Sequence, residues 1–459
     1  MAETEQFNGN RQRGYGFLRT WNARATAFPS TTSMTLSLKG FSPAPNSMVT
    51  VRDGGYARPV RPTSTLIRQL EPDDLAAADE LGRLAFGSAP STAPPPREPR
   101  PGHTGYGAFD PDGRLVGKAV DLHHEQWWAG RRVPAADVAG VAVLPEARGR
   151  GVALALLREL LAGARDRGAA ISALYPTVTG PYRRAGWEVA GALRAVDLPT
   201  VALPRHRPAA GLTVRPGGPA DLDATTDLYE RIARHRCGLL TRRGAAFDPD
   251  QPPTALPDGV DGLTLVEQDG RLVGYASWQR GRGYDQDAVL TVEEALASTP
   301  EAARELIGVL ASWQSVTPTI RLWPLGSDAV AAHLPLEQAR QHEQRLWMHR
   351  PVDVVRAVRS RGWPAHVRGK VDFALTDELA PWNSGSWRLE VDGGTAELHR
   401  IPHEPATHLS VRGFALLYTG AANGHAVAEA GLLHCPAGSD PGALDLLGAG
   451  HRAELLDYF

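Results

Sequence analysis

A turn rich in glycine and arginine at residues 148–153 carries the clearest chemical signal in the sequence. It reads Arg-Gly-Arg-Gly-Val-Ala, fits the pattern R-x-x-G-x-[GA], and joins an apolar run at 137–145 to a leucine-rich run at 154–167. Small residues at the start of a helix leave its first backbone N–H groups uncovered, so these groups can hold a pyrophosphate. Nearby arginines add charge-assisted contacts. A strand-to-helix turn without a ligand is the alternative, because a six-residue pattern alone has low specificity.

Tyr182 is the second residue whose type and position suggest chemistry. It lies between a predicted strand at 171–176 and the run Arg183-Arg-Ala-Gly-Trp187. A phenol with a pKa of about 10 can protonate a departing thiolate of similar basicity. The alternative is a packed tyrosine whose hydroxyl has a structural partner.

Other catalytic motifs receive little support. The turn at 148–153 lacks the G-K-[ST] ending of a Walker loop and does not follow G-x-G-x-x-G. No Ser-His-Asp or Cys-His nucleophile is recognisable. The run from His123 to Glu125 has metal-ligating residue types but no completing ligand set. We therefore expect no metal, and a solvated loop beside Trp127 and Trp128.

Alternation and turn residues predict the elements that position these groups. Residues 65–70 predict a strand, and a helix begins at Glu71, with a proline and acids in its first turn. Residues 106–109 and 114–119 predict a hairpin around an Asp-Pro-Asp-Gly turn. A proline-rich loop occupies 88–102.

A weak internal repeat indicates a duplicated domain. The hexapeptides Asp-Gly-Arg-Leu-Val-Gly at 112–117 and 269–274 are identical, and strand, helix and hairpin follow the same order around each. The second copy has a strand at 288–292, but Glu293-Glu-Ala-Leu-Ala follows it in place of a glycine turn. A polar, proline-bearing linker at 203–211 joins the copies.

Two further regions flank the repeat. After about Trp363, residues 386–391 and 395–399 alternate around an Asp-Gly-Gly turn, which predicts a hairpin. Residues 1–60 carry few acids and no sustained apolar period. We expect a disordered or over-extended N-terminus there, with a transit peptide as the alternative.

Composition excludes several classes of protein. A length of 459 residues suggests two to four domains, and a net charge of −2 gives no global attraction to nucleic acid or to an anionic membrane. No apolar run approaches about 20 residues, so no membrane span is expected. Cys237 and Cys435 exclude a disulfide scaffold, leave a single bridge open, and favour a reducing, cytoplasmic location.

The glycine turn and its flanking strand resemble the acyl-CoA-binding segment of GCN5-related N-acetyltransferases (GNAT). In that fold the strand before the turn splays from its neighbour, and its free N–H groups bind the pantetheine arm and polarise the thioester carbonyl. The segment from Thr177 to Trp187 resembles the closing x-x-x-Y-x-x-x-G-[FWY] pattern, in which Tyr182 lies beside the thiol leaving group. The resemblance assigns acetyl-CoA binding to Val141, Ala142, Val143, Gly149, Arg150, Gly151, Val152, Ala153, Leu154, Thr177 and Val178.

The order of the segments resembles the Eis (enhanced intracellular survival) family of N-acetyltransferases. Further matches are the Gly-Leu-Leu-Thr-Arg run at 238–242 and the segment 345–363. The resemblance implies an α/β fold with mixed α+β sheets: two tandem GNAT-type domains followed by a sterol-carrier-protein-like α+β domain. The implied bounds are 61–205 for the catalytic domain, 206–360 for a degenerate copy without a CoA site, and 361–459 for the last domain.

In that family the C-terminal carboxylate enters the active site as the general base, beside the tyrosine acid. Carried over, the base is the α-carboxylate of Phe459 and the acid is Tyr182. An α-carboxylate with a pKa of about 3.5 is a weak base, so it would act on an ammonium already poised to lose its proton. A frayed terminus is the alternative.

The resemblance also implies an amine acceptor, aminoglycoside-like or lysine-like, and a homohexamer. A polycationic acceptor needs a carboxylate-lined cleft, and the candidates are Asp79, Glu80 and Asp457. The chain departs from the family near the pocket, at 175–181 and in the loop at 88–102. Two alternatives stay open: an acyltransferase with a longer acyl-CoA donor or a biosynthetic acceptor, and a non-catalytic scaffold that binds a lipid or another ligand.

Overall fold

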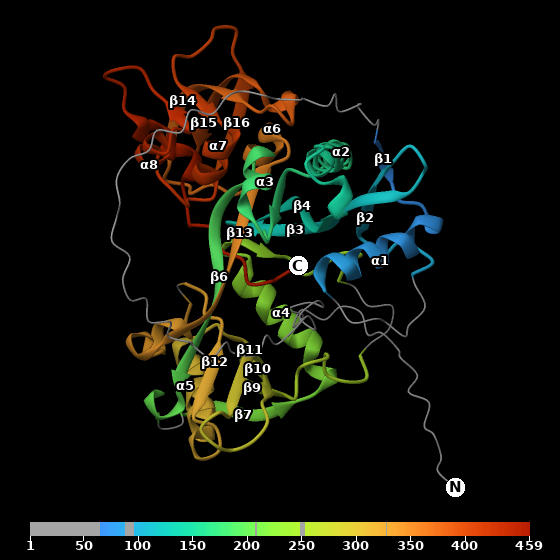
Figure 1. Cartoon of the computed structure of the whole chain (residues 1–459). Helices are drawn as coiled ribbons and strands as arrows, with labels where there is room; N and C mark the ends of the chain where they lie inside the picture. The colour runs from blue at the N-terminus through green and yellow to red at the C-terminus, as the bar shows by residue number, and fades with distance from the viewer. Residues whose placement is uncertain (1–64, 88–95, 207–208, 248–252, 327) are drawn as a thin grey trace, which may run out of the picture.

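The fold is given by a computed structural model that describes residues 65–87, 96–206, 209–247, 253–326 and 328–459. The expectation for residues 1–60 and part of the proline-rich loop therefore lie outside the described residues. Figure 1 shows the first sheet unit in the middle and right of the molecule, the second unit below it, and the C-terminal domain at the upper left. No helix in these described ranges is long and apolar enough to cross a membrane.

The first unit is one half of a large mixed sheet with helices on both faces. Strands β1 to β4 are antiparallel neighbours, and β4 runs parallel to β5. Helix α2 buries a leucine-rich face against the sheet, as its sequence period predicts. The elements are β1 (Leu66–Gln69), α1 (Leu75–Phe86), β2 (His103–Phe109), β3 (Leu115–Trp128), β4 (Arg131–Val143), α2 (Val152–Asp166), β5 (Ile171–Leu174), α3 (Thr179–Arg184) and β6 (Glu188–Pro199).

The second unit repeats this order of strands and helices. Its β11 runs parallel to β12, as β4 does to β5. The elements are β7 (Leu212–Gly217), α4 (Leu222–Ala233), β8 (Cys237–Leu240), β9 (Gly262–Gln268), β10 (Arg271–Arg280), β11 (Val289–Ala297), α5 (Pro300–Ala311), β12 (Thr319–Leu322) and β13 (Arg340–Pro351).

The two identical hexapeptides occupy equivalent places in the two units. Each forms a turn and the start of the following strand, β3 in the first unit and β10 in the second. A Cβ added to Gly117 would lie 3.0 Å from Val152 of α2, and one added to Gly274 would lie 3.3 Å from Ala302 of α5. Both glycines therefore let a helix pack closely on the strand, which gives the repeat a structural reason.

The two units exchange their last strands and so form one continuous sheet. Across the described residues the large sheet has 13 strands, in the order β1-β2-β3-β4-β5-β13-β6-β12-β11-β10-β9-β7, with β8 paired to β3. Strand β13, from the second unit, pairs with β5 of the first, and β6 pairs with β12. Because strands cross between units, the division at 205/206 stays a prediction.

The C-terminal domain packs a five-stranded sheet of the described chain against two short helices. Its strand order is β16-β15-β14-β17-β18. Its fully buried Phe373, Leu389 and Phe414 belong to one apolar core that also includes Trp128 and Ile171 of the first unit. The elements are α6 (Val354–Ser360), β14 (Arg368–Thr376), β15 (Gly385–Asp392), β16 (Thr395–Arg400), β17 (His408–Ser410), α7 (Val411–Tyr418), α8 (Gly424–Glu429) and β18 (Leu433–His434).

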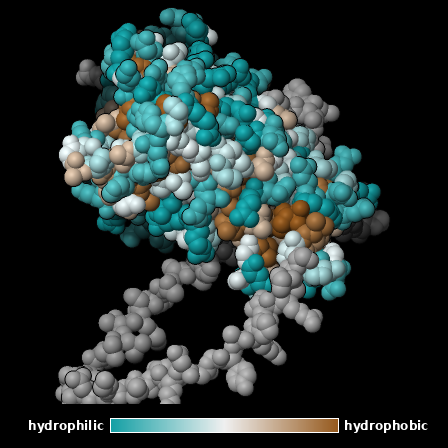
Figure 2. All heavy atoms as spheres, turned by 90° about the horizontal axis from the view of Figure 1, so that it is seen from above, coloured by the Kyte–Doolittle hydropathy of each residue, from teal (hydrophilic) through white to brown (hydrophobic). Residues whose placement is uncertain are grey.

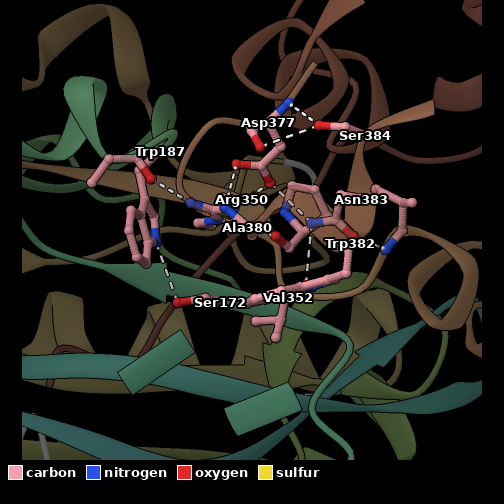
Figure 3. Close-up of polar contacts among 12 residues, drawn as sticks. Ser172, Trp187, Arg350, Val352, Asp377, Ala380, Trp382, Asn383 and Ser384 are labelled. Atoms are coloured by element: carbon pink, nitrogen blue, oxygen red, sulfur yellow. Dashed lines mark hydrogen bonds and ion pairs between the residues drawn. The ribbon is translucent and has the colours of Figure 1, made fainter. Parts of the chain in front are cut away.

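A buried arginine fastens the C-terminal domain to the first unit. Arg350 of β13 pairs with Asp377 at 2.5 Å, donates to the carbonyl of Ala185 and lies 4.9 Å from the ring centre of Trp187 (Figure 3). Asn383 donates to the same carboxylate at 2.9 Å. A fully buried guanidinium is stable only when a carboxylate and carbonyl groups compensate its charge. Because Arg350 also bonds the carbonyl of Ala185, its pairing with Asp377 fixes the segment that follows α3.

Most apolar side chains lie inside these layers. Figure 2 shows a face that is largely hydrophilic, with hydrophobic residues in separate small groups and one larger group at the lower right. The described surface still exposes single large apolar residues, such as Leu66, Leu84 and Val201. Both cysteines are free, Cys237 buried and Cys435 half-buried.

We predict that His349 makes the protein sensitive to acid. This fully buried ring stacks on Tyr418 at 5.5 Å, and neither of its nitrogens has a hydrogen-bond partner among the described residues. Burial lowers its pKa to about 3, with help from the positive charges of Arg361 and Arg350. In the unfolded chain this histidine is protonated below about pH 6.5, whereas in the folded chain it stays neutral down to about pH 3. The free energy of unfolding therefore falls as the pH drops across that window.

The thermal midpoint of His349→Phe, measured from pH 7.5 to 4, should therefore fall less steeply with acid than that of the wild type. Over the whole window between the two pKa values, this histidine lowers the free energy of unfolding by about 4–5 kcal/mol. Parallel curves for the two proteins would contradict the assignment.

Candidate active site

Strand β4 separates from β5 at the position expected for a thioester. The parallel ladder pairs Ala135 with Ile171 and Val138 with Leu174, and β5 then ends while β4 continues to Val143. Beyond Val138 the edge of β4 that faces β5 has no strand partner, so its N–H groups can bind a ligand.

A bulge in β4 bends the strand at this point. The register with β3 shifts between the pairs Lys118–Ala142 and Val120–Ala139, and Gly140 has a φ of +58°. Glycine adopts this left-handed conformation without strain, which explains its place in the bulge. The bulge thus lies just before the predicted donor residues Val141, Ala142 and Val143.

The glycine turn after β4 is open, as a phosphate cradle requires. Gly149 and Gly151 have φ values of +75° and +78°, and a Cβ added to either would meet nothing within 4 Å. The first bond of α2 runs from the amide of Ala155 to the carbonyl of Gly151, 3.0 Å. The amides of residues 152–154 therefore have no acceptor within the helix and face the helix N-terminus, where an anion is favoured. Arg148 is held by Val143, whose carbonyl accepts from its Nε at 3.1 Å.

Tyr182 lies on the short helix α3 beside the same cluster. Its ring contacts Trp187 edge to face at 6.5 Å, and it packs on the core that Val141, Val143 and Leu154 also border. Within the described residues its hydroxyl has no hydrogen-bond partner, so the alternative of a structurally paired tyrosine is not what the fold shows. Burial raises the pKa of Tyr182 to about 12.

The glycine after Tyr182 explains the closing motif. Gly186 has a φ of +90°, and a Cβ there would lie 2.9 Å from both Arg350 and Val411. Arg350 reaches past it to the carbonyl of Ala185 at the end of α3. The buried Arg350–Asp377 pair therefore fixes the helix that carries Tyr182. Residues 177 and 178 precede α3 on an exposed segment, with Val178 61% exposed.

The last residues of the chain run into the middle of the molecule. Figure 1 shows the C-terminus between β3 of the first unit and α4 of the second. Leu455 and Leu456 are buried, and Tyr175 donates from its hydroxyl to the carbonyl of Asp457 at 2.8 Å. The ring of Phe459 lies 5.3 Å from that of Tyr175, which directly follows β5. Residue 459 therefore lies at the end of β5, the strand from which β4 separates.

Arg242 holds this tail from the second unit. Its Nε donates to Asp457 at 2.9 Å, and its two terminal nitrogens donate to Glu294 of β11 at 3.1 and 2.7 Å. Its guanidinium lies 3.6 Å from the ring centre of Tyr229. Tyr275 donates to Glu294 at 2.5 Å. These five residues form the tail clamp, and all five are buried.

A histidine–aspartate pair adjoins Phe459. Asp137 is fully buried and accepts from the amide of Ala173 at 2.9 Å and from His124 Nδ1 at 3.0 Å. An ionised carboxylate only accepts hydrogen bonds, so Nδ1 is the donor in this pair. The His124 ring lies 5.4 Å from that of Phe459. The expected solvated loop at residues 123–125 is wrong: they lie in β3, and His124 is buried.

In the second copy, the described residues before α5 form no open glycine turn, and a side chain caps the helix. Thr299 caps α5 by accepting from the amide of Ala302 at 3.1 Å. β11 also continues beyond its last pair with β12, Val292 with Leu322, but Glu294 in this extension belongs to the tail clamp. In the described chain no three metal-ligating side chains gather at one site.

Comparisons with known domain families find three domains in the chain. Residues 66–190 and 238–359 each match an acetyltransferase (GNAT) domain, and residues 354–452 match a sterol carrier protein domain. An N-acetyltransferase of Streptomyces avermitilis is 28% identical over 315 residues, 63% of this chain and 73% of its own length.

Solved structures share the whole architecture. The GCN5-related N-acetyltransferase from Kribbella flavida superposes with a TM-score of 0.71 at 28% identity, over 86% of this chain and 99% of that one. Eis1 from Mycobacterium abscessus superposes with a TM-score of 0.66 at 22% identity, over 86% and 100%.

Two GNAT domains followed by a sterol-carrier-like domain define a class of acetyltransferases, and the fold expected from the sequence is confirmed. The chain is a GNAT-type acetyltransferase, and its fold is like that of Eis1 from Mycobacterium abscessus.

We predict that Arg242→Met releases the tail. The substitution leaves Asp457 and Glu294 buried without their cation, which costs about 3–5 kcal/mol. The thermal midpoint should fall, and carboxypeptidase should trim the folded variant faster than the wild type.

Arg243→Met is the matched control. This neighbouring arginine pairs with Asp227 and Glu230 on the surface, where an ion pair contributes about 0–1 kcal/mol. Unchanged stability and trimming in Arg242→Met would show that the clamp does not hold the tail.

Proposed function

We propose that this enzyme transfers the acetyl group of acetyl-CoA to an amine by direct attack. The observation that carries the proposal is the separation of β4 from β5 directly before the open glycine turn, with Tyr182 beside both. Residues 141–143 would bind the pantetheine arm and the thioester oxygen. Residues 149–154, with Arg150, would hold the pyrophosphate, and Thr177 and Val178 would line the opposite wall. The thioester supplies the activated acetyl group.

The protons are handled by two residues that reach the site from different domains. The α-carboxylate of Phe459 would accept the proton that the attacking ammonium loses, directly or through water. Tyr182 would donate its proton to the departing sulfur, because burial keeps the phenol protonated at working pH. Amides of β4 would stabilise the negative charge on the thioester oxygen. Holding both substrates in register contributes much of the rate.

The two alternatives make different demands on the fold. A longer acyl donor needs room beyond Val141 and Val143, and a series of acyl-CoA chain lengths would reveal it. A lipid-binding scaffold needs a cavity in the C-terminal domain, whereas Phe373, Leu389 and Phe414 fill that core. The filled core favours the role of this domain as a support for the tail.

The acceptor is tested with a panel of amines. Protein with an unmodified C-terminus is incubated with acetyl-CoA and aminoglycosides, lysine peptides or polyamines, and thiol release is followed with mass spectrometry of the products. Acetylated product identifies the acceptor class, and the mass increments show whether transfer is multiple. Size-exclusion chromatography with light scattering tests the homohexamer that the Eis resemblance suggests.

Tyr182→Phe should lower kcat by about 10²–10⁴-fold and leave the affinity for acetyl-CoA unchanged, because only the proton donor is removed. Since the pKa of Tyr182 is raised to about 12, the wild-type rate should not decline between pH 8 and 10 through loss of this proton. A variant with near wild-type kcat would remove Tyr182 from the mechanism.

Deletion of Phe459, or a short extension after it, should abolish turnover while acetyl-CoA still binds. Either change moves the α-carboxylate away from residue 459, whose ring lies against those of Tyr175 and His124. A matched extension at the N-terminus is the control. Full activity in the C-terminally extended protein would overturn the role of the carboxylate.

A further inference from the structure

Lys118 is a half-buried lysine of β3 that has no role in the mechanism above. Neighbouring residues of a strand face opposite sides, and Gly117 faces α2, since a Cβ there would lie 3.0 Å from Val152. Lys118 therefore points to the other face, toward α1. A Cβ added to Gly82 of α1 would lie 2.6 Å from its Nζ, so the ammonium rests against the helix where a glycine makes room.

The same side chain borders the bulge in β4. Lys118 pairs with Ala142, and a Cβ added to Gly140 would lie 4.0 Å from Lys118 Cε. The pyrophosphate cradle begins α2, so the donor enters from the α2 face of the sheet. We expect the amine to approach from the α1 face, where Lys118 lies opposite Ala142, next to the predicted donor residue Val141 in the chain.

The ammonium of Lys118 is short of partners. No hydrogen bond or ion pair joins it to any residue in the described ranges. Burial lowers its pKa; the charge of Asp79 offsets this in part, and that of Arg100 adds to it. A cation withdrawn from water without a direct partner is unfavourable, and an anionic ligand would relieve that cost.

Two of the three carboxylates expected for a polycationic acceptor are engaged in ion pairs. Asp457 pairs with Arg242 at 2.9 Å, and Glu80 pairs with Arg83 at 2.5 Å. Asp79 is exposed on α1, and its charge already acts on Lys118. The α1 face thus offers a cation next to the predicted reaction centre, where a polycation would be repelled.

We propose that Lys118 is an anion-binding subsite of the acceptor pocket, and that the acceptor is an amine that also carries a carboxylate, such as an amino acid. A lysine on a flexible stem can meet a carboxylate as a point charge while the amine of the same molecule faces the thioester. The inference rests on the proposed transferase function and names the substrate class of that site.

The test compares acceptors that differ only in this charge, such as lysine with lysinamide, or ornithine with its amide. In the wild type, kcat/KM for the acid should exceed that for the amide by about 10-fold or more. This is the ratio expected when one charge-assisted hydrogen bond is present for the acid and absent for the amide. In Lys118→Met this ratio should fall toward one. Lys370→Met, which changes an exposed lysine of β14, should keep the wild-type ratio.

Equal use of acid and amide by the wild type, or an undiminished ratio in Lys118→Met, would overturn the subsite. The chain has three lysines, at 39, 118 and 370, so mass spectrometry can assign any self-acetylation. Acetylation of Lys118 itself would mean that this residue is an acceptor and not a subsite.

Turnover of no amine at all would count against the proposed function. The subsite is then judged by calorimetry, with CoA-saturated protein titrated with N-acetyl-lysine and its amide. Tighter binding of the acid that is lost in Lys118→Met supports the subsite, and equal binding overturns it.

Discussion

The buried ion pair between Arg242 and Asp457 is the interaction on which the geometry of the site depends. One guanidinium satisfies the carboxylates of Asp457 and Glu294, so removing it would leave two buried charges without compensation. The pair ties the end of the third domain to the core of the second unit. Residue 459 follows two positions later and so lies at the end of β5 in the first unit. The second unit thereby holds the end of the chain against the first unit.

A second buried pair fixes the opposite side of the site. Arg350 and Asp377 join β13 to the C-terminal domain, and Arg350 holds the end of α3 just after Tyr182. Because β13 has crossed from the second unit into the first sheet, all three domains contribute to the position of this tyrosine. The proposed acid and the proposed base are therefore both placed by interactions between domains.

The local features of the site could be predicted from the sequence because short patterns encode them. The glycine turn and the spacing from Tyr182 to Gly186 depend on φ angles and close contacts within a few residues. Arg242, Asp137 and Lys118 could not be assigned in this way, since their surroundings come from strands far apart in the chain. The polar run at 123–125 suggested a solvated loop. In the structure these residues belong to β3, where side chains alternate between the two faces, and His124 is buried in contact with Asp137. The hexapeptide repeat indicated the duplication, whereas the exchange of β6 and β13 has no local signature.

The most direct test of the account is a crystal structure of the full chain with CoA bound. We predict the pyrophosphate on the amides of residues 149–154, the pantetheine arm along residues 141–143, and the sulfur within hydrogen-bonding distance of the Tyr182 hydroxyl. The α-carboxylate of Phe459 should lie on the other side of the sulfur, facing the α1 side of the sheet. A CoA molecule bound elsewhere, or a sulfur remote from both Tyr182 and Phe459, would contradict the account.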